Sequence, residues 1–198
     1  MSCEASVTEK KAELRSLIRR ARRGLDDEQR RAAAEAVAEK LVSVDALVSS
    51  KIVLAYMPMK YELDILPAVE KLRSRGVKAA FPLCIENGGL RLFIPAERNG
   101  FKVGAYGILE PDPDTAEEIA PEELDAIILP AIGFDRSCSR LGQGGGYYDR
   151  LLARTSCLTV AVGFDCQLVD EVPVEETDKP VDIVVTPGCF AVRVHNIL

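Results

Sequence analysis

The first quarter of the chain carries apolar residues at helical spacing. Ser6 followed by Glu9 matches a capping box, which marks the start of a helix. Beyond it, apolar residues recur every three or four positions, at Leu14, Leu17, Ile18, Ala21 and Leu25. We predict that this stripe of the first helix faces the core, with its basic residues on the other faces. Asp26 and Asp27 begin a second predicted helix, which runs through an alanine-rich stretch to about Val48.

Short apolar runs farther along the chain predict buried strands. They cover residues 51–56, 77–81, 89–95, 125–129, 158–164 and, as the final strand, 181–185. Pro82 and Pro130 are expected to end two of them. A helix is predicted over residues 65–75, and residues 86–89 (Glu-Asn-Gly-Gly) predict a hairpin turn. We therefore expect an α/β fold, a single three-layer domain over residues 1–198 with a mostly parallel central sheet flanked by helices. Its site should lie at the carboxyl ends of the strands.

One stretch shows neither helical spacing nor an apolar strand run: residues 140–149, Arg-Leu-Gly-Gln-Gly-Gly-Gly-Tyr-Tyr-Asp. They follow the predicted strand 125–129 and precede the apolar pair Leu151 and Leu152 on a short predicted helix. Glycines let backbone N–H groups approach a bound group closely, and a helix N-terminus favours negative charge. The stretch therefore predicts a loop that holds a polyanion such as a polyphosphate; the alternative is a glycine-rich surface turn. It matches neither the Walker loop nor the dinucleotide-binding fingerprint.

The distribution of charge favours the polyanion. The formal net charge of −6 argues against general nucleic-acid affinity. Residues 10–23 nevertheless contain seven basic residues and one acid, a local +6 that leaves −12 for the rest of the chain. Such asymmetry suggests that this segment faces an anion. RNA binding through the basic helix is a weaker alternative, because no aromatic-interleaved basic sheet motif accompanies it.

The six cysteines are scattered, without a C-x-x-C pair or the spacing of a metal site. In an α/β chain of this size they predict reduced thiols. No apolar run reaches membrane-spanning length, and the N-terminal residues lack the apolar core of a signal peptide. We expect a cytoplasmic monomer with neither a membrane nor a nucleic-acid partner.

Together with Pro130, Gly133, Phe134 and Asp135, residues 140–149 resemble the signature of the 5-formyltetrahydrofolate cyclo-ligases, also called methenyltetrahydrofolate synthetases. Residues 11–15, Lys-Ala-Glu-Leu-Arg, resemble the K-x-x-L-R segment with which that family grips ATP phosphates, and residues 57–64 resemble its folate-side segment. The resemblance extends over residues 11–186. It implies that ATP and 5-formyltetrahydrofolate give 5,10-methenyltetrahydrofolate, ADP and phosphate, through phosphorylation of the formyl oxygen and ring closure by N10.

The resemblance also implies which residues form the site. ATP would be bound by Lys11, Arg15, Arg140, Leu141, Gly142, Gln143, Gly144, Gly145, Gly146, Tyr147 and Tyr148. The reduced folate would be bound by Met57, Glu62, Gly144, Gly145, Gly146, Tyr147, Tyr148 and Gln167. Mg²⁺ would be held by Asp149 and Asp178. The catalytic residues would be Arg140 and Tyr148.

Several of these residues also have a plainer interpretation. Asp178 is as well placed to cap its loop as to bind a metal, and at least one of the two tyrosines is expected to pack under the short helix. Glu62 could complement the dipole of the next helix, although a carboxylate also suits the paired donors of a pterin edge. Residues 19–23 are expected to form a solvated basic surface.

A second function remains open beside the family reaction. The alternative is a non-catalytic or differently specific member of the same fold that binds a nucleotide or a phosphate. Two positions keep this alternative open: Cys138 and Ile65 stand where the family commonly has glycine and threonine.

Overall fold

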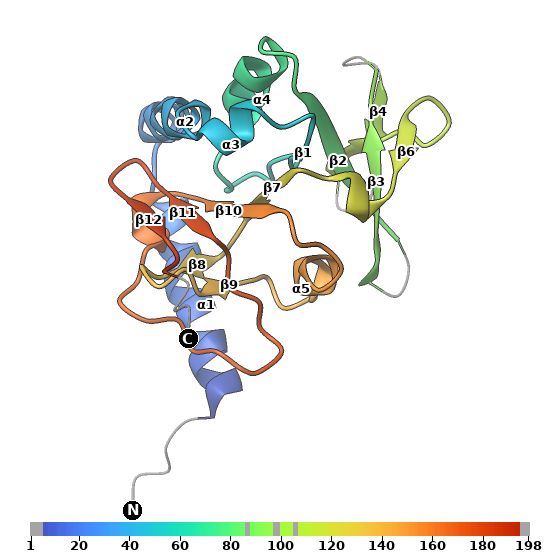
Figure 1. Cartoon of the computed structure of the whole chain (residues 1–198). Helices are drawn as coiled ribbons and strands as arrows, with labels where there is room; N and C mark the ends of the chain where they lie inside the picture. Colours follow the sequence, from blue (N-terminus) through green and yellow to red (C-terminus); the bar gives the residue numbers. More distant parts are fainter. Residues whose placement is uncertain (1–5, 86–87, 97–99, 105–106, 195–198) are drawn as a thin grey trace, which may run out of the picture.

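The computed structural model describes residues 6–85, 88–96, 100–104 and 107–194. Within them, an eight-stranded sheet forms the middle layer (Figure 1). Its strands in spatial order are β12 (Phe190–Val192), β11 (Ile183–Val185), β10 (Leu158–Val162), β7 (Ala126–Pro130), β1 (Ile52–Leu54), β2 (Lys78–Cys84), β3 (Leu90–Ile94) and β6 (Glu117–Ile119). The strands from β11 to β2 are parallel, whereas β12, β3 and β6 pair antiparallel. The mostly parallel sheet is thus confirmed.

Helices cover both faces of this sheet. One face carries α2 (Asp27–Val42), α3 (Asp45–Val48) and α4 (Leu66–Arg73), at the top of Figure 1, and the other carries α1 (Val7–Arg23) and α5 (Tyr147–Leu152). Two short antiparallel pairs stand outside the sheet, β4 (Phe101–Val103) with β5 (Leu109–Pro111) and β8 (Gly133–Phe134) with β9 (Arg140–Leu141). Single 3-10 turns occur at Pro121–Glu123 and Asp165–Gln167. The predicted three-layer arrangement is confirmed.

Apolar clusters on both faces hold the layers together. Val53 of β1 packs in the cluster beneath α2–α4, and the next residue, Leu54, packs in the cluster on the α5 side. Successive strand residues point to opposite faces, so a strand buried on both faces needs a continuous apolar run. This is why the central strands could be recognised as unbroken apolar segments.

The buried face of α1 differs from the predicted one. Leu17 is 64% exposed, whereas Ile18 is buried and packs against Leu141. Two cations on the helix, Lys11 and Arg22, are buried as well. The expectation that residues 19–23 form a solvated surface is therefore wrong for Arg22. Positions 11, 18 and 22 share one side of a 3.6-residue helix, and that side faces the protein.

Three predicted boundaries are also wrong. The helix predicted over residues 26–48 is two helices, because the chain leaves the helix at Ser43 and Val44. β2 continues through Pro82, whose missing N–H is tolerated because the pairing with β1 ends at Ala80 and leaves β3 as the neighbouring strand. The strand predicted as the last is followed by β12. The hairpin between β2 and β3 is confirmed by their pairing, but residues 86–87 of its turn lie outside the described residues.

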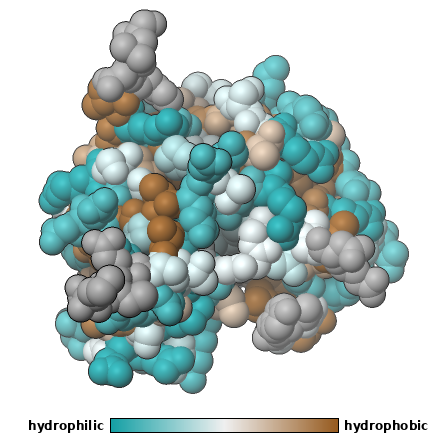
Figure 2. Space-filling model, turned by 90° about the horizontal axis from the view of Figure 1, so that it is seen from below, coloured by the Kyte–Doolittle hydropathy of each residue, from teal (hydrophilic) through white to brown (hydrophobic). Residues whose placement is uncertain are grey.

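The surface of the described part is polar for the most part. Seen from below, it is mostly hydrophilic, with hydrophobic side chains in small separate groups (Figure 2). Of the described helices, none combines the length and the apolar character needed to cross a membrane.

Candidate active site

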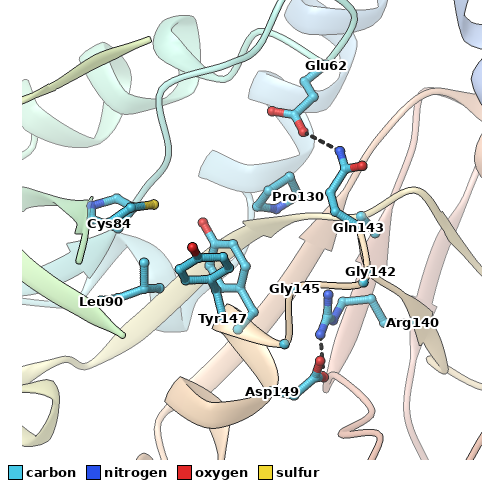
Figure 3. A pocket seen from close by; sticks show the side chains of 15 residues that line it. Glu62, Cys84, Leu90, Pro130, Arg140, Gly142, Gln143, Gly145, Tyr147 and Asp149 are labelled. Carbon is cyan, nitrogen blue, oxygen red and sulfur yellow. Dashed lines mark hydrogen bonds and ion pairs between the residues drawn. The ribbon is translucent and has the colours of Figure 1, made fainter. Parts of the chain in front are cut away.

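The chain segments that follow β1, β2 and β7 enclose a pocket at one edge of the sheet (Figure 3). It is lined by Glu62, Pro82, Cys84, Leu90, Pro130, Ala131, Arg140 and residues 142–149. Because β1, β2 and β7 are parallel, their carboxyl ends meet at this edge, where ligands of open α/β sheets bind. The volume of the cavity is about 150 Å³.

The glycine-rich loop, residues 142–146, is supported at both ends. Before it, β8 and β9 form a ribbon whose tip is closed by Asp135, which accepts backbone hydrogen bonds from Ser137 and Ser139. After it, α5 begins directly at Tyr147. Gly144 and Gly146 have φ angles of 106° and 67°, values that disfavour any side chain. Glycine is therefore required here by the backbone, in addition to the room it leaves for a ligand.

Cys138 and Ile65, the two residues that differ from the family pattern, have structural roles. Cys138, in the tip of the ribbon, has a φ of 68°, a left-handed conformation that glycine adopts readily and other residues rarely adopt. Its side chain is fully buried, and burial raises the pKa of its thiol to about 11. Ile65 is buried in the core at the start of α4. Neither residue alters the lining of the pocket.

Arg140 lies beneath the loop with its side chain only 3% exposed. Its Nη2 donates to Oδ1 of Asp149 at 2.5 Å (Figure 3), and its buried Nε has no hydrogen-bond partner among the described residues. A buried cation with an unused donor favours a nearby anion. Asp149, in the first turn of α5, is partly exposed and faces the pocket as well as Arg140.

Glu62 faces the glycine-rich loop from the opposite wall. Its Oε1 accepts a long hydrogen bond of 3.4 Å from Nε2 of Gln143, and its Oε2 accepts one of 3.1 Å from the backbone of Met59 (Figure 3). Gln143 is held in turn by Arg19, whose Nη2 donates to its Oε1 at 2.9 Å. Burial raises the pKa of Glu62 above the ordinary value of a glutamate. Glu62 thus links the wall after β1 to the loop.

Both tyrosines of the motif line the pocket. Tyr148 also packs against the core cluster on the α5 side, and burial raises the pKa of its hydroxyl, which remains protonated. Tyr147 carries the guanidinium of Arg150 over its ring, 5.5 Å from the centroid. The expectation that one tyrosine packs under the helix applies to Tyr148, which nevertheless keeps contact with the pocket.

The two cations of the K-x-x-L-R segment have different surroundings. Arg15 reaches the loop, where its Nε donates to the carbonyl oxygen of Gly142 at 2.9 Å. Lys11 instead bonds the carboxylates of Glu175 and Asp178 at 2.7 and 2.5 Å. Asp178 also accepts the backbone N–H of Glu175, so it caps its loop in this structure. Lys11 would have to leave both carboxylates to reach a triphosphate.

Besides Lys11, Arg15 and Asp178, three further residues expected to touch ligands lie outside the lining of the pocket. Leu141 is buried against Ile18. Gln167 is 1% exposed, and its side-chain amide forms hydrogen bonds with the backbone of Ala131, Ile132 and Phe164. It therefore stabilises the segment that follows β7. Met57 lines a different hollow, beside α4 and β4.

Sequence reasoning missed other residues of the site. Pro82, Cys84 and Leu90 line the pocket from β2 and β3, and strand topology was the signal that could have found them. Arg19 contacts the loop through Gln143, and Arg22 is buried. The helical spacing of positions 11, 15, 18 and 22 carried the signal for Arg22.

The two residues expected to hold Mg²⁺, Asp149 and Asp178, line the same hollow, beside the N-terminus of α5. No group of three or more metal-ligating side chains occurs among the described residues. Two carboxylates fit Mg²⁺ all the same, because this ion usually takes one or two carboxylates and completes its shell with phosphate oxygens and water.

Replacing Gly146 tests the backbone requirement of the loop. An added Cβ would lie 2.6 Å from Nη1 of Arg150 at a φ of +67°. We expect Gly146→Ala to lower the free energy of unfolding by about 1–2 kcal/mol, the cost of a left-handed non-glycine residue, as measured by urea denaturation. Gly24→Ala, at a φ of −76°, is the control and should show no such loss. Equal stability of both variants would contradict the requirement.

Fold and pocket together define the class of the protein. It is an α/β protein with a glycine-rich loop, a buried arginine and a facing carboxylate at the carboxyl ends of parallel strands. A family model, the 5-formyltetrahydrofolate cyclo-ligase family, matches residues 7–187. The chain therefore belongs to the 5-formyltetrahydrofolate cyclo-ligase family.

Individual relatives agree with this assignment. The chain is 33% identical over 177 residues to the 5-formyltetrahydrofolate cyclo-ligase of Escherichia coli K12, which covers 87% of this chain and 97% of the relative. It is 31% identical to that of Mycolicibacterium smegmatis, with 92% and 97% covered. The NMR structure of Aquifex aeolicus 5,10-methenyltetrahydrofolate synthetase matches with a TM-score of 0.84 at 34% identity and covers 95% of both chains.

Proposed function

We propose that this protein converts 5-formyltetrahydrofolate to 5,10-methenyltetrahydrofolate at the expense of ATP. The observation that carries the proposal is one pocket in which the glycine-rich loop and Arg140 face Glu62. Loop and arginine suit a triphosphate, and a carboxylate suits the donor edge of a pterin. Membership of the cyclo-ligase family supports the same reaction.

The reaction explains why these side chains are needed. The oxygen of a formamide is a poor leaving group, so it must be activated before N10 can close the ring. Transfer of the γ-phosphoryl group to that oxygen activates it and releases ADP. N10 then bonds to the formyl carbon and loses its proton, and the C–O bond breaks as phosphate leaves. Phosphoryl transfer asks a protein mainly for positioning and charge neutralisation. In this proposal Arg140, Arg15 and the backbone N–H groups of the loop perform both tasks; in support, Arg140 lines the pocket and Arg15 contacts the loop.

Each ligand has its own side of the pocket in this proposal. The triphosphate lies along residues 142–146 above Arg140, and the pterin lies against Glu62. Tyr148 lines the same pocket with a protonated hydroxyl, which can donate to the formyl oxygen or to the transferred group. Met57 lies in a different hollow and Gln167 bonds the backbone of Ala131, so any contribution of these two residues to folate binding is indirect.

We assign Mg²⁺ to Asp149 and Asp178, which share one hollow. When bound, the ion would neutralise charge on the phosphates. Until then Asp149 is neutralised by Arg140 and Asp178 by Lys11. Binding of the metal nucleotide would therefore release both cations toward the phosphate oxygens.

Substitution of Asp149 tests the metal assignment. We expect Asp149→Asn to raise the Mg²⁺ concentration needed for half-maximal rate about tenfold or more, because an amide oxygen is a poorer ligand for a hard cation than a carboxylate. A magnesium titration of initial rates measures this, with exposed Asp170→Asn as the control. An unchanged titration in Asp149→Asn would leave Asp149 as a partner of Arg140 only.

The direct test of the function uses purified protein with 5-formyltetrahydrofolate, ATP and Mg²⁺. We expect ATP-dependent appearance of the methenyltetrahydrofolate chromophore with stoichiometric release of phosphate. Binding of nucleotide without any turnover of the folate would support the alternative, a non-catalytic or differently specific member of the fold. Cys138 and Ile65, which kept that alternative open, are both accounted for by the fold.

Our proposal also covers the setting in which the enzyme acts. Residues 1–198 form one domain that works as a cytoplasmic monomer, with ATP and reduced folate as partners and no nucleic acid. The net charge of −6 supports the last point. The free thiols of the described cysteines, Cys84, Cys138, Cys157, Cys166 and Cys189, support a reducing compartment.

A further inference from the structure

The side chain of Arg150, in α5, joins two segments that are far apart in the sequence. Its Nε and Nη2 both donate to the carbonyl oxygen of Gly88, at 3.1 and 2.7 Å. The same Nη2 donates to the carbonyl oxygen of Gly145 at 2.7 Å. Gly88 belongs to the connection between β2 and β3, and Gly145 belongs to the glycine-rich loop. One guanidinium therefore ties the β2–β3 hairpin to the loop.

These two segments form different walls of the pocket. Cys84 ends β2 and Leu90 begins β3, and both line the pocket; we call them the hairpin wall. Figure 3 shows them on one side of the pocket, with Gly145 of the glycine-rich loop on the other. Gly88 lies between Cys84 and Leu90 in the sequence. Its attachment to the loop therefore fixes the separation of the two walls.

The contacts of Arg150 depend on the shape of its guanidinium as well as on its charge. The group is a planar fork whose N–H bonds point in fixed directions, so it can bond two carbonyl oxygens at once. Its face lies over the ring of Tyr147, with Cζ 5.5 Å from the centroid, in a cation–π contact. A lysine would keep the charge but would lack the fork.

We propose that Arg150 is a positioning residue for the reaction, because it sets the distance between the hairpin wall and the glycine-rich loop. The inference rests on the proposed function, in which the triphosphate lies on the loop. Pro82 and Leu90 make the hairpin side of the pocket apolar, which suits the body of a folate better than a charged phosphate. Phosphoryl transfer requires the two substrates to meet in one geometry, and a misplacement of about 1 Å can lower a rate roughly a hundredfold.

Replacing Arg150 tests this role through the two substrates separately. We expect Arg150→Met to lower kcat/KM for 5-formyltetrahydrofolate roughly ten- to a hundredfold. The dissociation constant of ATP, measured by calorimetry, should stay close to wild type, because Arg140 and Arg15 remain in place. Arg154→Met removes another exposed arginine and is the control, with kinetics near wild type. Equal losses for folate and ATP would overturn the positioning role and assign Arg150 to the loop alone.

Arg150→Lys separates the fork from the charge. If Arg150 acts by holding two carbonyl oxygens, Arg150→Lys should be impaired nearly as much as Arg150→Met, because an ammonium group does not reproduce the fork. Recovery of wild-type kinetics in Arg150→Lys would show that positive charge is sufficient, and the positioning role would be wrong. Because Arg150 is exposed, the melting temperature of both variants should remain close to that of the wild type.

Gly88→Ala breaks the same contact from the hairpin side. Gly88 has a φ of 75°, and an added Cβ would overlap Nη2 of Arg150 and lie 3.1 Å from its Cζ. The guanidinium would have to leave the carbonyl oxygen, so kcat/KM for the folate should fall as in Arg150→Met. Gly76→Ala is the matched control, because Gly76 has a φ of 90° with no atom within 4 Å of an added Cβ. It introduces the same backbone strain and should leave kcat/KM unchanged.

The double variant Arg150→Met, Gly88→Ala completes the test. Residues that act through one contact are not additive, so the double variant should lose little more kcat/KM than Arg150→Met alone. Independent losses that multiply would overturn the inference. Turnover by the wild type with unchanged kinetics in Arg150→Met would also overturn it, while leaving the proposed function in place. Absence of turnover in the wild type would overturn the proposed function itself, and the role of Arg150 with it.

Discussion

Arg140→Met is expected to lower kcat/KM for ATP by roughly two to three orders of magnitude, the usual effect of removing a preorganised charge-stabilising group. The guanidinium is 3% exposed and lies under the glycine-rich loop with its Nε unpartnered. Its removal takes away the buried positive charge that faces the phosphates and leaves Asp149 without its partner. Initial rates over a range of ATP concentrations measure the effect.

Arg154→Met is a matched control for this change. Arg154 is exposed, and its contact with Glu122 spans 3.8 Å, so its loss should leave the kinetics near wild type. A fall of less than tenfold in Arg140→Met, with the protein folded, would contradict the assignment of Arg140 to the phosphates. Thermal denaturation of both variants separates loss of fold from loss of catalysis.

A double-mutant cycle extends this prediction to α1. If Lys11 leaves Asp178 and Glu175 to join Arg140 on one triphosphate, Lys11→Ala and Arg140→Ala should be coupled by roughly 0.5–3 kcal/mol in ATP affinity. Lys11 and Arg15 are one helical turn apart and can act on one ligand. Strict additivity would show that Lys11 remains a partner of the loop at residues 175–178.

Glu62→Gln is expected to raise KM for 5-formyltetrahydrofolate by roughly ten- to a hundred-fold, while KM for ATP stays close to wild type. The physical reason is the loss of charge from hydrogen bonds that a carboxylate makes to paired donors, each worth about 1.5–3 kcal/mol when one partner is ionised. Asp64→Asn, an exposed acid two residues away, is the control. Equal loss for both substrates would assign Glu62 a structural role.

The same residue predicts a pH dependence. Burial raises the pKa of Glu62 above its ordinary value, and the ionised form is the one that accepts from the pterin. As pH falls through this raised pKa, Glu62 is protonated, and kcat/KM for the folate should fall. The acid limb of the profile should therefore lie at higher pH than that of an exposed glutamate. Glu62→Gln should lack this limb, and a limb that persists in the variant would have to come from another group.

The sequence by itself determined the local parts of this protein. The start of α1 at Ser6, the buried strands and the glycine-rich loop were all recognisable, because capping, strand burial and left-handed glycines depend on neighbours in the chain. Parallel strands joined by helices also set where the pocket lies, since carboxyl ends then share one edge. The resemblance to the family named Arg140, Glu62 and residues 142–149, and the structure brings them together at this edge.

Only the tertiary structure decided which partner each side chain meets. Periodicity placed Leu17 and Ile18 on one stripe, but packing against Leu141 buries Ile18 and leaves Leu17 exposed. Likewise, Lys11 bonds Asp178, a residue 167 positions away, and Gln167 turns to the backbone behind the pocket. Such contacts join segments that are distant in sequence, and their geometry follows from how the layers pack. The burial of Arg22 was decided in the same way.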